Sequence, residues 1–268
     1  MSDDNGIVTP SQWQQWRAAT PARLALGRAG AGMPTDETLR FGWAHAMARD
    51  AIHAALDTAA LEALLRAQGW QVVQATSRAA DRTTYLRRPD LGRQLAEDAA
   101  QTLDTGAGEC DVCFVVGDGL SSLAVARHAA PFLAALRPHL PAGTRIAPVT
   151  LVTQARVAVA DEVGALYGAR LSVMLIGERP GLSSPDSLGI YLTHAPRIGR
   201  SDAERNCVSN VRPEGLGYGL AAFKLAWLMR EALRRGLTGV ALKDESDLAV
   251  LAADAAPIMA ALPGDKTP

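Results

Sequence analysis

Two polar segments that follow apolar runs carry the residues of this chain that could do chemistry. Val173 to Ile176 is apolar and stops at GERPGL, residues 177 to 182. A buried strand that ends in a Gly/Pro turn places the next polar groups at the carboxyl edge of a sheet, where open α/β folds bind ligands. Cys207 follows later, among small polar residues. We expect a ligand site around Glu178, although a strand followed by an ordinary surface loop gives the same pattern.

A glycine-containing turn, GDGLSS at 117–122, joins a predicted strand to a predicted helix. Its glycines permit close backbone approach, and Ser121 can cap free N–H groups at the helix start. The spacing matches neither the dinucleotide fingerprint nor the P-loop, and no lysine follows. Two interpretations stay open: turn and cap chemistry alone, or one wall of a ligand site.

A hydrolase triad is the main alternative chemistry. Ser121, His194 and either Asp186 or Asp244 could supply its members. The nucleophile pattern GxSxG is absent, and each of the five histidines has a simpler place on a predicted helix or strand end. We therefore predict no triad and name no catalytic residue.

The cysteines indicate a reduced core rather than a metal or redox centre. Cys110 and Cys113 form CDVC inside a predicted buried strand, with no second ligand pair and no flanking histidine. Three cysteines cannot all pair within one chain. We expect free thiols and no metal ligands.

The elements that must position these residues divide the chain near residue 108. Residues 1–108 are predicted to form a helical N-terminal region, because apolar residues recur at helical spacing. The expected helices are Leu39 to Leu56, Leu61 to Gln68 and Leu91 to Leu103.

Short apolar runs alternate with amphipathic segments in residues 109–268 and predict a Rossmann-like domain. The expected strands are Asp111 to Val116, Ile146 to Val152, Leu171 to Ile176 and Gly189 to His194. The expected helices are Ser121 to Leu140, Val157 to Tyr167 and Leu216 to Arg235, with a last helix within 247–268. Right-handed crossovers then imply an α/β fold with a mostly parallel sheet and helices on both faces.

Composition narrows the class of protein. The 268 residues are 48% apolar, and their net charge of −1 favours neither nucleic acid nor acidic membranes as a partner. No segment approaches the roughly 18 apolar residues of a membrane span, and the polar start lacks the features of a signal peptide. We expect a cytoplasmic protein that binds neither nucleic acid nor membrane.

Several segments together resemble one known family. They are TPARLALGRAGAGMPT at 20–35, SRAADRTTYLRRPDLGRQL at 77–95, DGLSS at 118–122, QARVAVADEVGALYGAR at 154–170, and GERPGL followed by CVSN at 207–210. From about Thr20 to about Leu242, the chain resembles the small (light) subunit of ethanolamine ammonia-lyase. The resemblance implies an ammonia-lyase that uses adenosylcobalamin to convert ethanolamine to acetaldehyde and ammonia. It also implies a large subunit that carries the substrate site, and an assembly with six copies of each subunit.

The resemblance further implies that Val157, Glu178 and Cys207 contact the cobalamin. Val157 would pack against the corrin ring, Glu178 would accept hydrogen bonds from corrin amides, and Cys207 would line the pocket. Each has a plainer alternative: core packing for Val157, an ion pair with Arg179 or another base for Glu178, and a buried small residue for Cys207. The chain has no DxHxxG motif, so we expect base-on cobalamin whose cobalt is not ligated by this chain.

Two further segments have open roles. DRTTYLRRPDLGR at 81–93 is either a solvated helix start or a partner surface, and ALGRAGAGMPT at 25–35 either wraps over the sheet or reaches the large subunit. The competing functions are a stand-alone small-molecule enzyme and an interaction module without cofactor contact. The resemblance is also compatible with packaging in a bacterial microcompartment.

Overall fold

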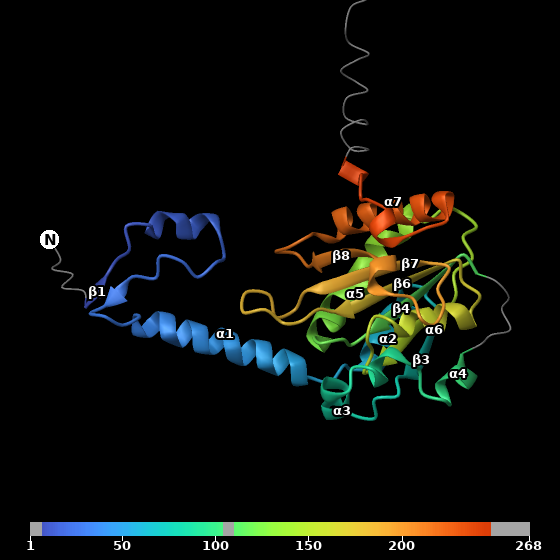
Figure 1. The fold of residues 1–268 in the computed structure, drawn as a ribbon, viewed down its shortest axis with the longest axis horizontal. Helices are drawn as coiled ribbons and strands as arrows, with labels where there is room; N and C mark the ends of the chain where they lie inside the picture. The colour runs from blue at the N-terminus through green and yellow to red at the C-terminus, as the bar shows by residue number, and fades with distance from the viewer. Residues whose placement is uncertain (1–6, 104–109, 248–268) are drawn as a thin grey trace, which may run out of the picture.

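A mixed six-stranded sheet forms the centre of the molecule (Figure 1). The computed structural model describes residues 7–103 and 110–247. The strands run in the spatial order β3-β5-β4-β6-β7-β8. Their bounds are β3 Val72–Thr76, β4 Val112–Gly117, β5 Val149–Thr153, β6 Leu171–Gly177, β7 Leu188–His194 and β8 Asn206–Val211.

The α/β class is confirmed, but the sheet is mixed where we expected it to be mostly parallel and Rossmann-like. The pairings among β3, β5, β4 and β6 are parallel, whereas β7 and β8 pair antiparallel to their neighbours. The reason lies in the connection after β6. Residues 178–187 join β6 to β7 without a helix, whereas a parallel crossover needs about a dozen residues or more and usually a helix.

Helices cover both faces of the sheet, as expected. On one face, α2 (Thr58–Ala67), α5 (Ser122–Leu136) and α7 (Tyr218–Arg235) contribute to the larger apolar core. On the other face, α6 (Val159–Leu166) and the short α4 (Ala99–Thr102) pack in a second core. Both layers follow from strands that are buried on both sides, since every residue of β4 and β6 is buried.

The strand order reverses at β4. The chain passes through α5 to β5 on one side of β4, and then through α6 to β6 on the other side. Open α/β sheets bind ligands at such a switch point, outside the carboxyl ends of the strands. The turns that follow β4, β5 and β6 are therefore brought to one edge.

The N-terminal region is only partly helical. It contains α1 (Thr35–His53) and α2, but also the antiparallel pair β1 (Val8–Thr9) and β2 (Arg28–Ala29), and β3, which joins the main sheet. Its remaining short elements are η1 (Gln14–Ala19), α3 (Arg82–Arg87) and η2 (Leu91–Arg93). The short elements of the later residues are η4 (Arg137–His139), η5 (Asp202–Glu204) and η6 (Gly239–Ala241). The proposed boundary near 108 and nearly all of the last predicted helix lie outside the described residues.

The helix predicted over Leu91 to Leu103 is wrong. Only η2 and α4 are helical there, because the backbone between them continues the hydrogen bonding of β3. The Arg78 N–H donates to the Gln94 carbonyl at 2.9 Å, and the Ala96 N–H donates to the Thr76 carbonyl at 2.9 Å. Local helical spacing is overridden by these long-range bonds.

Candidate functional site

A pocket of about 430 Å³ lies at the carboxyl edge of the parallel strands. Its lining comes from the turns after β4, β5 and β6, together with α3 and β7. The lining residues are Tyr85, Leu120, Arg156, Val157, Ile176, Gly177, Glu178, Arg179 and Tyr191. Two of the three expected site residues, Val157 and Glu178, therefore share one pocket, and we call it the edge pocket.

The turn after β4 is built mainly by close backbone packing. Gly119 has φ +58°, and a Cβ there would lie 2.3 Å from the Gly177 carbonyl oxygen. The Leu120 N–H donates to the same oxygen at 3.0 Å. Ser121 caps α5 by accepting from the Ala124 N–H at 3.3 Å. The turn and the helix cap expected from the sequence are therefore both present. Among the residues of this turn, only Leu120 lines the edge pocket.

Asp118 ties the end of β4 to the turn after β5. Its buried carboxylate accepts the N–H groups of Gln154 at 3.0 Å and Ala155 at 2.9 Å. Burial raises the pKa of Asp118, and the two N–H donors oppose that shift. Because Arg156 and Val157 follow directly, this carboxylate fixes the wall of the edge pocket.

Glu178 is half-buried and faces β8. Its carboxylate oxygens accept the Asn210 N–H at 3.2 and 3.3 Å. Gly189 leaves room for it, since a Cβ there would lie 3.0 Å from the Glu178 Cγ. Within the described part of the chain Glu178 makes no ion pair with Arg179. One N–H uses only part of the acceptor capacity of a carboxylate.

Val157 and Cys207 occupy different positions relative to the pocket. Val157 is half-buried, packs partly on the second core and lines the edge pocket. Cys207 lies on edge strand β8 opposite Tyr191 in the register, is exposed, and does not line the pocket itself. Although the residue is solvent-accessible, desolvation by its surroundings raises the pKa of its thiol, and the Glu178 charge acts in the same direction.

The other two cysteines lie in the core. Cys110 and Cys113 are buried in the apolar cluster beneath α6, and all three cysteines of the chain are free. Burial raises the pKa of the Cys113 thiol. Neither thiol approaches the edge pocket, so CDVC is part of the core packing.

Sequence reasoning missed a stack of two arginines on one tyrosine beside the pocket. The Arg156 guanidinium lies 4.2 Å and the Arg82 guanidinium 4.7 Å from the centre of the Tyr85 ring. Arg156 Nε is buried without a hydrogen-bond partner. Burial raises the pKa of Tyr85 to about 12, so its hydroxyl stays protonated and donates to the Ala155 carbonyl at 3.1 Å. The available signal was that Arg156 directly precedes Val157 in QARVAV.

The segment 81–93 therefore has two kinds of residue. Asp81 caps α3, while Arg82 and Tyr85 turn inward to the sheet. Arg88 and Asp90 form an exposed ion pair of 2.7 Å instead. Arg82 and Tyr85 therefore support the wall of the edge pocket. Neither of the two sequence interpretations, a solvated helix start or a partner surface, predicted this role.

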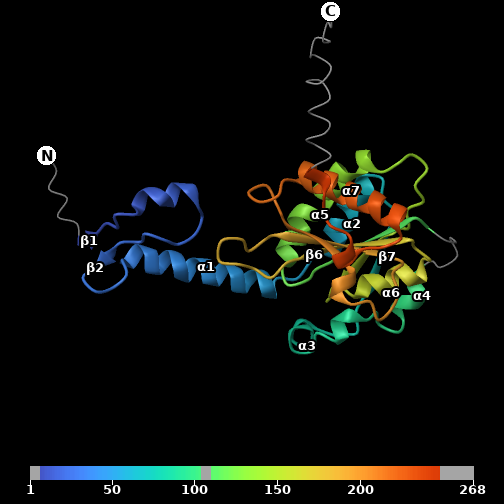
Figure 2. The ribbon, with the colours of Figure 1, turned by 45° about the horizontal axis from the view of Figure 1, so that its top comes forward.

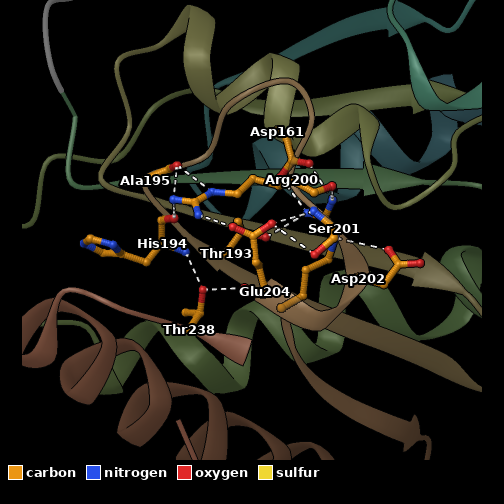
Figure 3. A network of polar contacts seen from close by, with 10 residues as sticks. Asp161, Thr193, His194, Ala195, Arg200, Ser201, Asp202, Glu204 and Thr238 are labelled. Atoms are coloured by element: carbon orange, nitrogen blue, oxygen red, sulfur yellow. Dashed lines mark hydrogen bonds and ion pairs between the residues drawn. The ribbon is translucent and has the colours of Figure 1, made fainter. Parts of the chain in front are cut away.

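A polar network holds the segment that leads into β8 (Figure 3). Arg205 donates to both carboxylate oxygens of Asp161 at 2.6 Å and to the Thr193 hydroxyl at 3.0 Å. Both side chains of the ion pair are 2% exposed. Arg200 bonds to the Ala195 carbonyl and to Glu204, which caps η5 through Ser201. Because Arg205 precedes β8, this network fixes the start of the strand that carries Cys207.

A model of one protein family matches residues 10–243, and its description is the ethanolamine ammonia-lyase light chain. The chain belongs to this family. It is 58% identical to the ethanolamine ammonia-lyase small subunit of Azotobacter vinelandii over 92% of this chain and 94% of the relative. The small subunit of Ralstonia nicotianae is 57% identical over 94% of this chain and 95% of that protein. The Pseudomonas putida small subunit is 56% identical, covering 91% and 92% respectively.

Membership confirms the resemblance seen in the sequence motifs and makes the chain a subunit of a carbon–nitrogen lyase. The names of the family and its members, light chain and small subunit, imply a larger partner chain. In the described residues, no helix has the length and apolar character of a membrane span.

Proposed function

We propose that the chain is the small subunit of an adenosylcobalamin-dependent ethanolamine ammonia-lyase and forms part of the cobalamin site at the interface with the large subunit. The holoenzyme would convert ethanolamine to acetaldehyde and ammonia. The observation that carries the proposal is the edge pocket, where Val157 and Glu178 lie together at the switch point of the sheet.

The residues present fit the chemistry of a corrinoid. A corrin is a broad apolar disc with amide groups around its rim, so it needs an apolar wall and a few polar groups. Leu120, Val157 and Ile176 supply apolar surface. Glu178 supplies acceptors for amide N–H groups, and the unpartnered Nε of Arg156 supplies a donor for an amide carbonyl.

The role of this chain would be to hold and orient the cofactor and to exclude water from one side of it. When bound, adenosylcobalamin supplies the radical that abstracts hydrogen from the substrate. Among the described residues, no histidine lines the edge pocket. We propose a base-on cofactor whose cobalt is not ligated by this chain, since the sequence has no DxHxxG motif. The catalytic groups and the substrate site would then belong to the large subunit.

Cys207 would contact the cofactor from outside the present pocket lining. It lies on β8 beside Tyr191, which lines the pocket. A disc broader than the edge pocket would extend past Tyr191 toward β8, where Cys207 is exposed. The assignment of Cys207 therefore depends on the breadth of the ligand, whereas that of Glu178 does not.

Family membership supports three further proposals about the assembly. The assembly would hold six copies of each subunit, it would be cytoplasmic with neither nucleic acid nor membrane as a partner, and its packaging in a microcompartment depends on the host. Mass measurement of the intact complex tests the first of these directly.

Turnover assays separate this function from the two competing ones. We expect the isolated chain to show no ethanolamine deamination, and the large subunit with adenosylcobalamin to need this chain for activity. Turnover by the isolated chain would favour a stand-alone enzyme. Full turnover by the large subunit alone would leave the chain without a cofactor role.

Glu178→Gln tests the cofactor contact itself. The substitution keeps the size of the side chain but replaces one acceptor oxygen with an NH2 group, so we expect about a tenfold weaker apparent affinity for adenosylcobalamin. Assembly with the large subunit should not change. The measurement is a cobalamin titration of the purified complex, followed by its absorption spectrum.

The matched control is Glu245→Gln. Glu245 is 54% exposed and pairs with Arg235 at 3.9 Å, away from the edge pocket. Its substitution should leave the titration unchanged. Equal cobalamin affinity in the Glu178 variant and the control would remove Glu178 from the site.

A further inference from the structure

The first part of the chain forms an arm that leads away from the sheet (Figures 1 and 2). We define the arm as residues 7–53, which comprise β1, η1, β2 and α1. In both views, α1 connects the part of the arm that holds β1 and β2 to the rest of the described chain. We call this remainder, residues 54–103 and 110–247, the body. The segment 25–35 therefore lies in the arm and does not wrap over the sheet.

The arm is an ordered structure of its own. Arg17 donates to the Glu37 carboxylate at 2.6 Å, and Arg40 binds the same group at 3.1 Å. Glu37 is 6% exposed although it lies on a projecting helix. Gly27 has φ +76° and passes so close to β1 that a Cβ there would lie 2.8 Å from the Thr9 carbonyl oxygen. The arm thus presents a fixed surface.

That surface is apolar to an unusual degree. Eight of the thirteen exposed large hydrophobic residues in the described part of the chain lie in the arm. They are Ile7, Val8, Trp13, Trp16, Met33, Leu39, Phe41 and Trp43. Leu39 and Trp43 share one face of α1 and are 67% and 70% exposed, whereas Phe41 lies on the opposite side. A helix that is apolar on several sides is normally buried by other elements.

The area is large enough for a stable interface. Eight large side chains with about half of their surface accessible supply on the order of 800 Å² of surface. This is comparable to the ~800 Å² that one partner contributes to a stable complex. Aromatic residues also dominate the energetics of such interfaces.

The arm is continuous with the edge pocket. The carbonyl of Ala54, just after α1, accepts the Ser122 hydroxyl at the start of α5, at 2.6 Å. Arg23 donates to the Leu182 carbonyl at 3.0 Å and to the Ser183 hydroxyl at 3.3 Å. Residues 182 and 183 belong to the loop that begins with Glu178. A partner that covers the pocket together with this loop would therefore also meet the arm.

We infer that the arm is the docking element of this chain for the large subunit, anchored by Leu39 and Trp43. The inference rests on the proposed function, because the partner that completes the cofactor pocket is the one that lies beside the arm. A second copy of this chain is the other occupant that the sedimentation experiment below tests. The matched family model includes the arm from residue 10 onward, so the arm is a family feature rather than an appendage.

The test is co-expression with a tagged large subunit. The double variant Leu39→Asp with Trp43→Asp should reduce the small chain recovered per large chain at least tenfold. Both side chains are exposed, so the free variant should keep the circular dichroism spectrum and thermal unfolding of the parent. Trp43→Phe alone should retain assembly, because it keeps the apolar contact.

The matched control is Leu64→Asp on α2. Leu64 is 54% exposed but belongs to the body, so its substitution should leave recovery unchanged. Hydrogen exchange provides a readout without substitutions: the amides of α1 should exchange more slowly in the complex than in the free chain.

Two outcomes would overturn the inference. The double variant could be recovered in full with the large subunit, or it could abolish only the self-association of the free chain in sedimentation. Neither outcome depends on cobalamin, whereas the Glu178→Gln titration is made on an assembled complex. The two experiments therefore distinguish a failure of the docking inference from a failure of the proposed cofactor contact.

Discussion

Backbone N–H groups place the carboxylates around the edge pocket more than opposite charges do. Asp118 accepts from two N–H groups of the turn after β5, and Glu178 accepts from the Asn210 N–H. Outside that pocket, Glu204 likewise accepts from the Ser201 N–H at 2.7 Å. Because a backbone donor cannot change rotamer, each of these bonds fixes a chain segment and not just a side chain.

Glu204 should titrate far below an ordinary glutamate. Its bond from the Ser201 N–H, followed by those from Arg200 and the Ser201 hydroxyl, lowers its pKa from 4.5 to about 2. A depressed pKa means that the contribution of the ionised group to stability is present above pH 4.5 and is lost as the pH falls toward about 2. Carbon-detected NMR titration of the Glu204 carboxyl measures this.

Ser201→Ala provides the comparison for Glu204. It removes the hydroxyl bond and keeps the backbone bond, so the pKa of Glu204 should rise but stay below 4.5. An unshifted pKa in the parent chain would show that the cap of η5 does not form in solution.

At the scale of elements, the end of β6 and the turn after β4 are packed backbone against backbone. A Cβ on Gly177 would lie 1.9 Å from the Ser121 carbonyl oxygen. Since the obstructing atom belongs to the backbone at the start of α5, a side-chain rotation cannot relieve the overlap. Glu178 follows Gly177 directly, so this contact also sets where the carboxylate enters the edge pocket.

Gly177→Ala should therefore destabilise the protein and weaken the cofactor site together. We expect a loss of about 3 kcal/mol in the free energy of unfolding, as for other overpacked positions. The apparent affinity of the complex for cobalamin should fall as well. Gly217→Ala is the control, because no atom lies within 4 Å of a Cβ at Gly217. Equal stability of the two variants in urea denaturation would contradict this account.

At the scale of the whole molecule, the stability of the body and the docking of the arm are separate properties. Both apolar cores consist of residues from Leu61 onward. Apart from the bonds of Arg23 to the loop at 182 and 183, the arm meets the body at the last turns of α1, where Ala48 and Ala51 are buried. The body should therefore fold without most of the arm.

Deletion of residues 1–45 tests this separation. It keeps the last turns of α1, and we expect the unfolding midpoint to fall by less than about 3 °C, corresponding to under about 1 kcal/mol. Leu65→Ala in the buried core should cost about 3 kcal/mol by comparison. Loss of cooperative unfolding in the truncated chain would show that the arm is part of the folding unit.

Elements with local patterns could be predicted from the amino-acid sequence. The strands β4, β5 and β6 and the helices α5, α6 and α7 follow from apolar periodicity, and strand direction then puts the turns after β5 and β6 on one edge. Strand direction predicted a site around Glu178, whereas Val157 was joined to it only by the family resemblance. The motifs around them also sufficed to indicate the family.

Features that depend on pairing between distant segments could not be predicted from local patterns and became visible only in the fold. The antiparallel course of β7 and β8 placed Cys207 beside Tyr191, on a strand that the sequence did not predict. The stack of Arg82, Tyr85 and Arg156 joins α3 to the turn after β5. The arm leads away from the sheet because most of its contacts are within the arm, and it meets the rest of the chain only through the end of α1 and through the loop at 182 and 183 in the described residues. Local periodicity specifies which face of an element is apolar, but long-range packing specifies what that face meets.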